Sequence, residues 1–141
     1  MNKIFRKFYS SIVKQPVIIT NNSWTKIREI LKQSNNKYGF IFYASSGGCN
    51  GFNYNLELLD KEQYNNLENN KIKPNIIYDS ESYANYNKVY IEPQSEMFLF
   101  GTTIDFIKED YNKNIFESKF IFIPDKKIAT SCGCGISFNP K

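Results

Sequence analysis

Apolar residues first recur with the period of a helix after residue 20. In NNSWTKIREILKQSNNKYG, residues 21–39, the positions three and four apart form one apolar stripe: Trp24, Ile27, Ile30 and Leu31. Asn22 or Ser23 can cap the N-terminus of this segment. The Asn35–Asn36 pair and Gly39 are expected to end it. The pattern therefore predicts one short amphipathic helix.

Most of the other periodic segments have the pattern of strands. Phe52, Tyr54, Leu56 and Leu58 alternate with polar residues, as in a half-buried strand. Further strands are predicted in four aromatic and β-branched runs: 40–44, 88–93, 101–107 and 117–124. Residues 95–100 fit either a helical turn or a strand. Many strands, one helix and no alternation of strand and helix predict a mainly β, β-rich α+β domain.

The segment 60–88 has little periodicity and is rich in Asn, Tyr, Lys and Glu. It is expected to form a low-complexity surface loop, with one short helix around Glu62–Leu67. No chemistry is visible in its pattern.

The net charge of +4 is concentrated at the start of the chain. Four basic residues fall within the first fourteen positions, Lys3, Arg6, Lys7 and Lys14, and no acid appears before Glu29. Without them, fourteen basic residues face fourteen acidic ones, so the remaining domain is neutral. A basic face for nucleic acid is therefore not expected.

The leader MNKIFRKFYSSIVK places apolar residues on one helical side and basic residues on the other. An amphipathic, basic, acid-free N-terminus is typical of a mitochondrial presequence. We expect residues 1–15 to be a targeting leader, cleaved between Ser10 and Gln15, and residues 16–141 to be one domain. The expected location is the mitochondrial matrix, or the cytoplasm if the segment is only a basic tail or a short capping helix.

Composition excludes several chemistries. Histidine is absent, which removes histidine metal sites and the base of a Cys–His catalytic pair. No apolar run is long enough to cross a membrane, so no membrane association is expected. Three cysteines is an odd count, which favours a reducing compartment over a disulfide scaffold. We expect a protein that is not an enzyme.

The three cysteines lie in two glycine-rich segments. Cys49 lies in SSGGCNG between two predicted strands, and Cys132 and Cys134 lie in SCGCG near the C-terminus. Residues two apart in an extended backbone point to the same face, so the terminal pair can address one metal. Gly48, Gly51, Gly133 and Gly135 leave room for a bulky group and for backbone N–H groups to approach sulfur. Thiolates suit iron–sulfur clusters, zinc and copper(I).

Other interpretations of these cysteines remain open on spacing alone. Free cysteines are often inert buried residues. A Cys132–Cys134 disulfide would be strained and easily reduced. A structural zinc module needs one ligand from elsewhere, and a thiol-redox module usually has Cys-x-x-Cys in a thioredoxin-like context.

Three blocks in order, GGCNGFNYNLEL, GTTIDFIKE and SCGCGISF, resemble the A-type iron–sulfur carrier family, the HesB/IscA-like proteins. The resemblance spans about residues 20–141. It implies a compact fold of two mixed sheets with an N-terminal helix and a flexible Cys-Gly-Cys C-terminal segment. It also implies that Cys49, Cys132 and Cys134 bind iron or a [2Fe–2S] or [4Fe–4S] cluster for maturation of [4Fe–4S] proteins. Eukaryotic members work in mitochondria, in agreement with the leader.

Two departures from the family pattern are visible. The stretch between Cys49 and Cys132 is longer than usual, with the extra residues in 60–88. Many relatives have Glu after Cys-Gly-Cys-Gly, where this chain has Ile136, so no carboxylate ligand is expected there.

The number of thiolates available to bind a cluster indicates which protein partners to expect. A cluster usually takes four protein ligands, and one chain offers three thiolates. A second subunit, glutathione or an open iron site can supply the rest. We expect a homodimer, or a heterodimer with a sister A-type protein, that meets iron–sulfur donor and acceptor proteins.

Overall fold

The computed structural model describes residues 17–47, 51–81, 86–125, 129–131 and 137–140, the last two ranges as backbone alone. One sheet has the order β1-β6-β7, with β1 Val17–Ile19, β6 Thr102–Ile107 and β7 Lys119–Ile123. The other has the order β4-β5-β2-β3-β9-β8. Its strands are β4 Asn75–Tyr78, β5 Lys88–Ile91, β2 Phe40–Gly47, β3 Gly51–Leu58, β9 Ser137–Pro140 and β8 Ala129–Ser131.

Both sheets are mixed, which confirms the expected fold class. In the smaller sheet β1 pairs parallel with β6, and β7 pairs antiparallel with β6. In the larger sheet only the β2–β5 ladder is parallel. The three-residue strand β1 was not expected, because so short a strand has no period of its own and exists through its pairing with β6. The expected leader, residues 1–15, lies outside the described residues.

The predicted helix is α2, Asn21–Ser34, and its cap differs from the prediction. Thr20, not Asn22 or Ser23, is the N-cap, and its hydroxyl accepts a hydrogen bond from the backbone N–H of Ser23 at 3.3 Å. Asn35 ends the helix in the left-handed conformation with φ 54°, as the Asn pair predicts. The helix therefore begins at Asn21, the first residue of the predicted segment, and its cap lies two or three residues earlier than expected.

Two hydrogen bonds, one buried and one partly buried, join the start of α2 to the middle of β6. The Ser23 hydroxyl donates to the carbonyl of Ile104 at 2.9 Å, and the Thr20 hydroxyl donates to the Asp105 carboxylate at 2.7 Å. Asp105 also accepts from the backbone N–H of Phe106 at 2.8 Å. The aspartate of the GTTIDF block thus fixes the helix against the smaller sheet.

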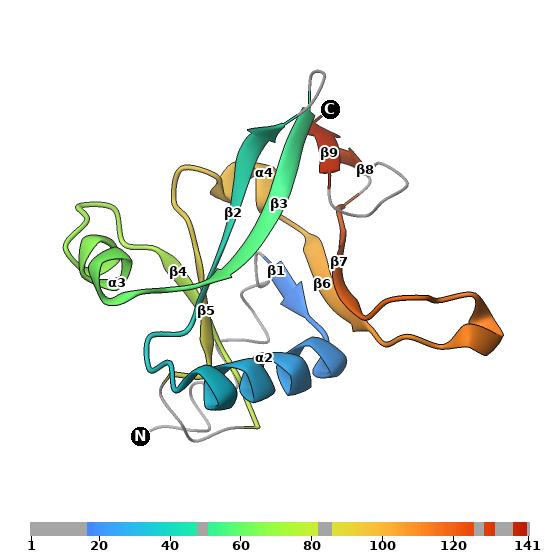
Figure 1. Cartoon of the computed structure of the whole chain (residues 1–141). Coiled ribbons are helices and arrows are strands. Elements are labelled where there is room, and N and C mark those ends of the chain that lie inside the picture. Colours follow the sequence, from blue (N-terminus) through green and yellow to red (C-terminus); the bar gives the residue numbers. More distant parts are fainter. Residues whose placement is uncertain (1–16, 48–50, 82–85, 126–128, 132–136, 141) are drawn as a thin grey trace.

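The main core lies between α2 and the two sheets (Figure 1). Helix α2 contributes three buried side chains, Trp24, Ile27 and Leu31, which are the predicted stripe apart from the partly buried Ile30. The larger sheet contributes Phe42 and Tyr54, and the smaller sheet contributes Ile104 and Phe122. Burial of this apolar surface is the main favourable term in folding, so these contacts fix how the sheets meet.

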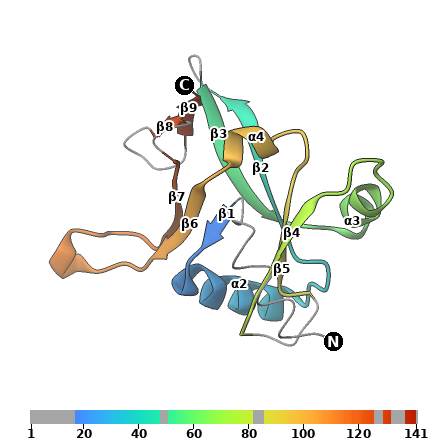
Figure 2. The same cartoon turned by 180° about the vertical axis from the view of Figure 1, so that it is seen from behind.

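A second, smaller core covers the opposite face of the larger sheet (Figure 2). Helix α3, Lys61–Glu68, lies there and buries Leu67 against Tyr90 and Leu59. Asp60 and Gln63 form a capping box at its start. The helix predicted around Glu62–Leu67 is therefore present. The strand β4 in the same segment was not expected, because NIIY is too short to show alternation.

Residues 95–100 form a helical turn rather than a strand, since α4 spans Glu96–Leu99 and buries Leu99. A 3-10 helix, η1, spans Tyr111–Lys113 between β6 and β7. None of the described helices is both long enough and apolar enough to span a bilayer.

A buried ion pair ties residue 79 to α2. The Asp79 side chain is only 1% exposed, and the Arg28 guanidinium donates to it at 2.5 and 2.9 Å. The backbone N–H of Glu81 donates a further bond at 3.1 Å. Burial by itself would raise the pKa of Asp79, but Arg28 and the Glu81 amide together hold it below its ordinary 3.8.

Asp79→Asn is expected to lower the free energy of unfolding by about 2–3 kcal/mol, because Arg28 loses the carboxylate that compensates its charge. This loss is smaller than the loss expected for a fully buried ion pair, because 32% of the Arg28 side chain is exposed. Urea unfolding at pH 7 measures the loss. The control is Glu81→Gln, which removes an exposed carboxylate 3.3 Å from the same guanidinium and should cost under about 1 kcal/mol.

The Asp79–Arg28 pair also predicts that the protein loses stability at acidic pH. A carboxyl whose pKa is lowered by folding stabilises the protein above its unfolded pKa, and this contribution disappears as pH falls through the folded pKa. The stability gap between wild type and Asp79→Asn should therefore be full at pH 7 and shrink below about pH 4. A gap independent of pH would show that the ionised carboxylate is not what stabilises this contact.

Candidate functional site

The hairpin of β2 and β3 encloses the first predicted cysteine segment. Its register runs from Phe40 opposite Leu58 to Gly47 opposite Gly51, so the last ladder pair flanks residues 48–50. Gly51, a predicted site-shaping residue, is the first residue of β3 and is half-buried. The remaining predicted site residues lie outside the described residues: Gly48, Cys49, Cys132, Gly133, Cys134 and Gly135.

The backbone on either side of the second cysteine segment pairs with this hairpin. In β9, Ser137 lies opposite Asn53 and Phe138 lies opposite Phe52. In β8, Ser131 lies opposite Phe138. Phe52, Phe138 and Ser131 therefore lie on three adjacent strands, next to the end of the hairpin where Gly47 meets Gly51 (Figure 1).

The inner face of the hairpin end is aromatic. Phe52 stacks on Phe98 with ring centroids 4.9 Å apart, and Tyr54 packs against Phe122 at 5.2 Å. Burial raises the pKa of Tyr54 to about 12, despite the opposing effect of the Thr102 hydroxyl, so the phenol is neutral at physiological pH. The inner face of the hairpin end is therefore apolar and uncharged around Phe52 and Tyr54. The described residues contain no group of three His, Cys, Asp or Glu side chains placed to hold a metal.

The outer face of the hairpin carries a diagonal series of polar contacts. Tyr43 donates to Glu57 at 2.9 Å, which raises the pKa of Tyr43 together with the larger effect of burial. One step nearer the turn, Asn55 donates to Ser45 at 2.8 Å. Such diagonal pairs across antiparallel strands stabilise register. Each successive contact in this series lies closer to Gly47, at the end of the hairpin.

Asn53 occupies the space above Gly47 at the end of this series. A Cβ added at Gly47 would lie 2.2 Å from Asn53 Nδ2 and 2.6 Å from its Cγ, far closer than non-bonded atoms approach. An alanine at this position would therefore force the Asn53 carboxamide to move. Sequence analysis missed Asn53, because its polarity fits the outer face of any strand, and alternation gives no sign that its carboxamide covers a glycine.

Gly47→Ala is expected to destabilise the protein by about 1–2 kcal/mol, because the Asn53 carboxamide must rotate away. In an Asn53→Ala background the same substitution should cost clearly less, since the obstructing atoms are gone. A double-mutant cycle in urea measures this coupling. Equal costs in both backgrounds would show that the close approach does not explain the glycine.

The middle block of the sequence pattern has a structural role. Gly101 adopts φ +78°, a conformation that favours glycine, and turns the chain into β6. Asp105 then binds Thr20 at the start of α2, as described above. This block therefore supports the fold.

No model of a known protein family matches the chain, whereas individual proteins do. The iron–sulfur cluster insertion protein ErpA of Buchnera aphidicola (subspecies Cinara cedri) is 31% identical over 129 residues, covering 91% of this chain and 99% of that protein. Two solved structures share the fold. Escherichia coli SufA, involved in biosynthesis of iron–sulfur clusters, superposes with TM-score 0.61 at 24% identity, covering 90% of this chain and 95% of SufA. IscA solved with the [2Fe–2S] cluster gives 0.60 at 17% identity, covering 89% and 97%.

The fold and the sequence matches define a protein of the iron–sulfur cluster assembly class. More narrowly, the chain belongs to the A-type iron–sulfur carrier family, the HesB/IscA-like proteins. The family resemblance stated from three sequence blocks is thereby confirmed.

Proposed function

We propose that this protein binds iron or an iron–sulfur cluster through Cys49, Cys132 and Cys134 and passes it on during maturation of [4Fe–4S] proteins. The metal or cluster is cargo here, taken up and released. Support comes from the family and from the relatives whose names state cluster insertion and a bound [2Fe–2S] cluster.

The observation that carries the proposal is the strand order β2-β3-β9-β8. Gly47 and Gly51 flank the Cys49 segment, and Ser131 immediately precedes Cys132. Neighbouring strands lie about 4.8 Å apart, so Ser131 and Phe52, two strands apart, are separated by about 10 Å. Cys132 follows Ser131 by one residue and Cys49 precedes Phe52 by three. Segments 83 residues apart in sequence thus begin within reach of one cluster.

Three thiolates leave a cluster short of the usual four protein ligands. A second copy of this chain or a sister A-type protein supplies the missing ligation in our proposal, with glutathione or an open iron position as the other routes. Transfer then proceeds by ligand exchange: an acceptor thiolate bonds to iron as a thiolate of the carrier leaves. Iron keeps its coordination number and no electron moves. Ile136, where many relatives have Glu, adds no carboxylate.

The place of action in our proposal is the mitochondrial matrix. It is supported by the basic, amphipathic, acid-free residues 1–15. Expression of the full chain with a C-terminal tag, followed by cell fractionation and intact mass of the recovered protein, tests both the location and the cleavage. An uncleaved protein in the cytoplasm would contradict this part of the proposal.

The test of cargo is anaerobic purification with iron, zinc and sulfide analysis, native mass spectrometry and visible absorbance. A carrier should be brown, contain iron and sulfide, and bind its cargo in a dimer. A colourless protein with stoichiometric zinc would establish the structural zinc alternative. A metal-free protein with a Cys132–Cys134 disulfide would establish the thiol-redox alternative.

Delivery is tested with the apo form of a [4Fe–4S] enzyme. Loaded protein should restore that enzyme's activity in the presence of an iron chelator, which removes free iron but not a cluster passed directly. Restoration that the chelator abolishes would contradict direct cluster transfer.

A further inference from the structure

Asn53 lies where three strands meet, next to the end of the hairpin. On one side it is opposite Ser45 of β2, and on the other side its backbone is opposite Ser137 of β9 (Figure 1). Ser45 lies on the strand that leads into the Cys49 segment, and Ser137 directly follows residues 132–136, which carry the second cysteine pair. Asn53 is therefore paired with a flank of each cysteine segment.

The Asn53 side chain covers the first of these flanks. Its carboxamide fills the position that a Cβ of Gly47 would take, with Nδ2 at 2.2 Å, Cγ at 2.6 Å and Oδ1 at 2.9 Å from that position. One step earlier in the diagonal series, Ser45 of β2 meets Asn55 with a side chain of its own. At Gly47 the carboxamide packs directly on backbone instead. Because closely packed atoms resist displacement, Asn53 limits movement of the chain two residues before Cys49.

The second flank is attached to the same residue by a short ladder. Within the described residues, β9 pairs with β3 at two positions, Phe52 with Phe138 and Asn53 with Ser137. So short a ladder opens easily unless its partner strand is held in place. Stacking of Phe52 on Phe98 at 4.9 Å holds the inner face of β3, and the contact of Asn53 with Gly47 holds the outer face. Movement of Asn53 therefore reaches both flanks.

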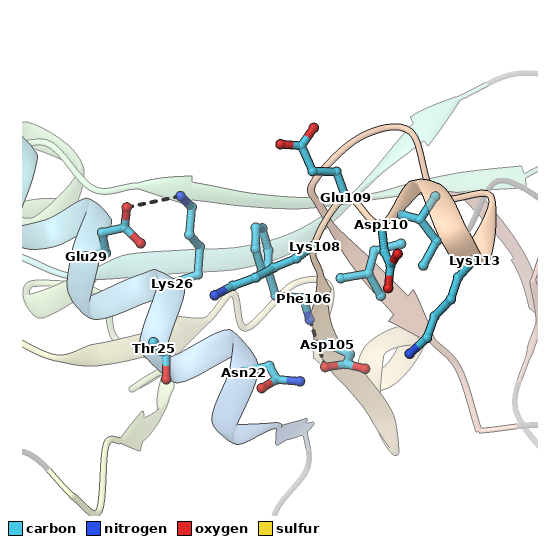
Figure 3. A pocket seen from close by; sticks show the side chains of 12 residues that line it. Asn22, Thr25, Lys26, Glu29, Asp105, Phe106, Lys108, Glu109, Asp110 and Lys113 are labelled. Atoms are coloured by element: carbon cyan, nitrogen blue, oxygen red, sulfur yellow. Dashed lines mark hydrogen bonds and ion pairs between the residues drawn. The ribbon is translucent and has the colours of Figure 1, made fainter.

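A groove of about 440 Å³ lies far from these contacts, between helix α2 and the segment that joins β6 to β7 (Figure 3). In both overall views α2 is at the opposite end of the molecule from the hairpin end (Figures 1 and 2). Three lysines and four carboxylates line the groove, and Lys26 pairs with Glu29 at 3.5 Å. These opposed charges select no ligand by charge. The contacts that position the cysteine segments thus lie at the hairpin end itself.

We propose that Asn53 is a positioning residue that fixes the flanks of the two cysteine segments relative to each other and thereby slows release of the cargo. It acts through Gly47 and through the β3–β9 ladder rather than by ligation. Without its carboxamide, the hairpin end and β9 move independently, and the thiolates of the two segments lose a common frame. That these segments carry iron or a cluster rests on the proposed function.

Hydrogen exchange in the reduced, metal-free protein tests the positioning without any cargo. In Asn53→Ala, the amides of residues 45–47 and 137–139, followed by NMR, should exchange about fivefold faster than in wild type. Asn55→Ala is the matched control. It removes a half-buried carboxamide from the same face of β3, with its bonds to Ser45 at 2.8 Å and to the Asn53 carbonyl at 3.2 Å, but leaves Gly47 covered. Its exchange at both flanks should stay within about twofold of wild type.

Release is measured on reconstituted protein, as the rate at which a chelator in excess removes iron, followed by visible absorbance. Asn53→Ala should bind iron and sulfide as wild type does but release iron about fivefold faster, with an altered visible circular-dichroism spectrum. Asn53→Leu puts two carbons where the carboxamide oxygen and nitrogen lie, so Gly47 stays covered and release should remain within about twofold of wild type. Urea unfolding first establishes that each variant is folded.

Three results would overturn the proposal. Equal acceleration by Asn55→Ala would show that any loss from β3 has the same effect. Faster exchange at 45–47 with none at 137–139 would show that the two flanks are not joined through Asn53. Release as fast in Asn53→Leu as in Asn53→Ala would show that filling the space above Gly47 is not what matters. Wild-type protein that takes up no iron would contradict the proposed function instead, and the exchange measurement would still decide the role of Asn53.

Discussion

Serine at position 49, or at position 132, is expected to reduce iron and sulfide bound after anaerobic reconstitution to under about a tenth of the wild-type amount. A hydroxyl is a far poorer ligand than a thiolate for iron, and the proposed site, with three thiolates, has none to spare. The readouts are visible absorbance with iron and sulfide analysis per chain. Cys134→Ser should weaken retention in the same direction.

The matched control for this prediction is Ser131→Ala. It changes the residue next to Cys132 without touching a thiol, so reconstitution should stay at the wild-type level. Each variant is first compared with wild type in urea unfolding, so that lost ligation is distinguished from lost fold. Full cluster loading by both Cys49→Ser and Cys132→Ser would contradict the assignment of these residues as ligands.

The long periodic elements could be predicted from sequence because their patterns are set by burial on one face. On α2, the stripe of Trp24, Ile27 and Leu31 faces the main core. On β3, the alternating apolar residues from Phe52 to Leu58 form the inward face. The short strands β1 and β4 could not be predicted. Three or four residues carry no period, and these strands exist through pairing with β6 and β5.

The position of the site could be predicted only in part. The order of the three sequence blocks indicated the family, and the structure adds that β8 and β9 continue the sheet of the Cys49 hairpin. Asn53 and Asp79 were beyond sequence reasoning. Both read as ordinary surface polar residues, yet one covers Gly47 and the other is buried against Arg28. Their roles come from tertiary contacts that leave no periodic signal.

Phe42→Ala is expected to lower the free energy of unfolding by about 3–5 kcal/mol. The Phe42 side chain is fully buried on β2 and stacks on both Tyr54 at 5.9 Å and Phe122 at 5.4 Å, which also contact each other at 5.2 Å. Because Phe122 lies on β7, this stack joins the larger sheet to the smaller one. Removing the ring leaves a cavity where the two sheets meet, and rigid strands on both sides limit collapse into it.

The same substitution at Phe116 is the control. Phe116 is 67% exposed in the segment that joins β6 to β7, so Phe116→Ala should change the free energy of unfolding by less than about 0.5 kcal/mol. Urea unfolding followed by tryptophan fluorescence suits both variants, because Trp24 lies in the core cluster that contains Phe42. Similar losses for the two variants would show that the stack does not hold the sheets together. Since Phe42 lies on the strand that leads to Gly47, its loss should also loosen the hairpin end where the cysteine segments converge in our proposal.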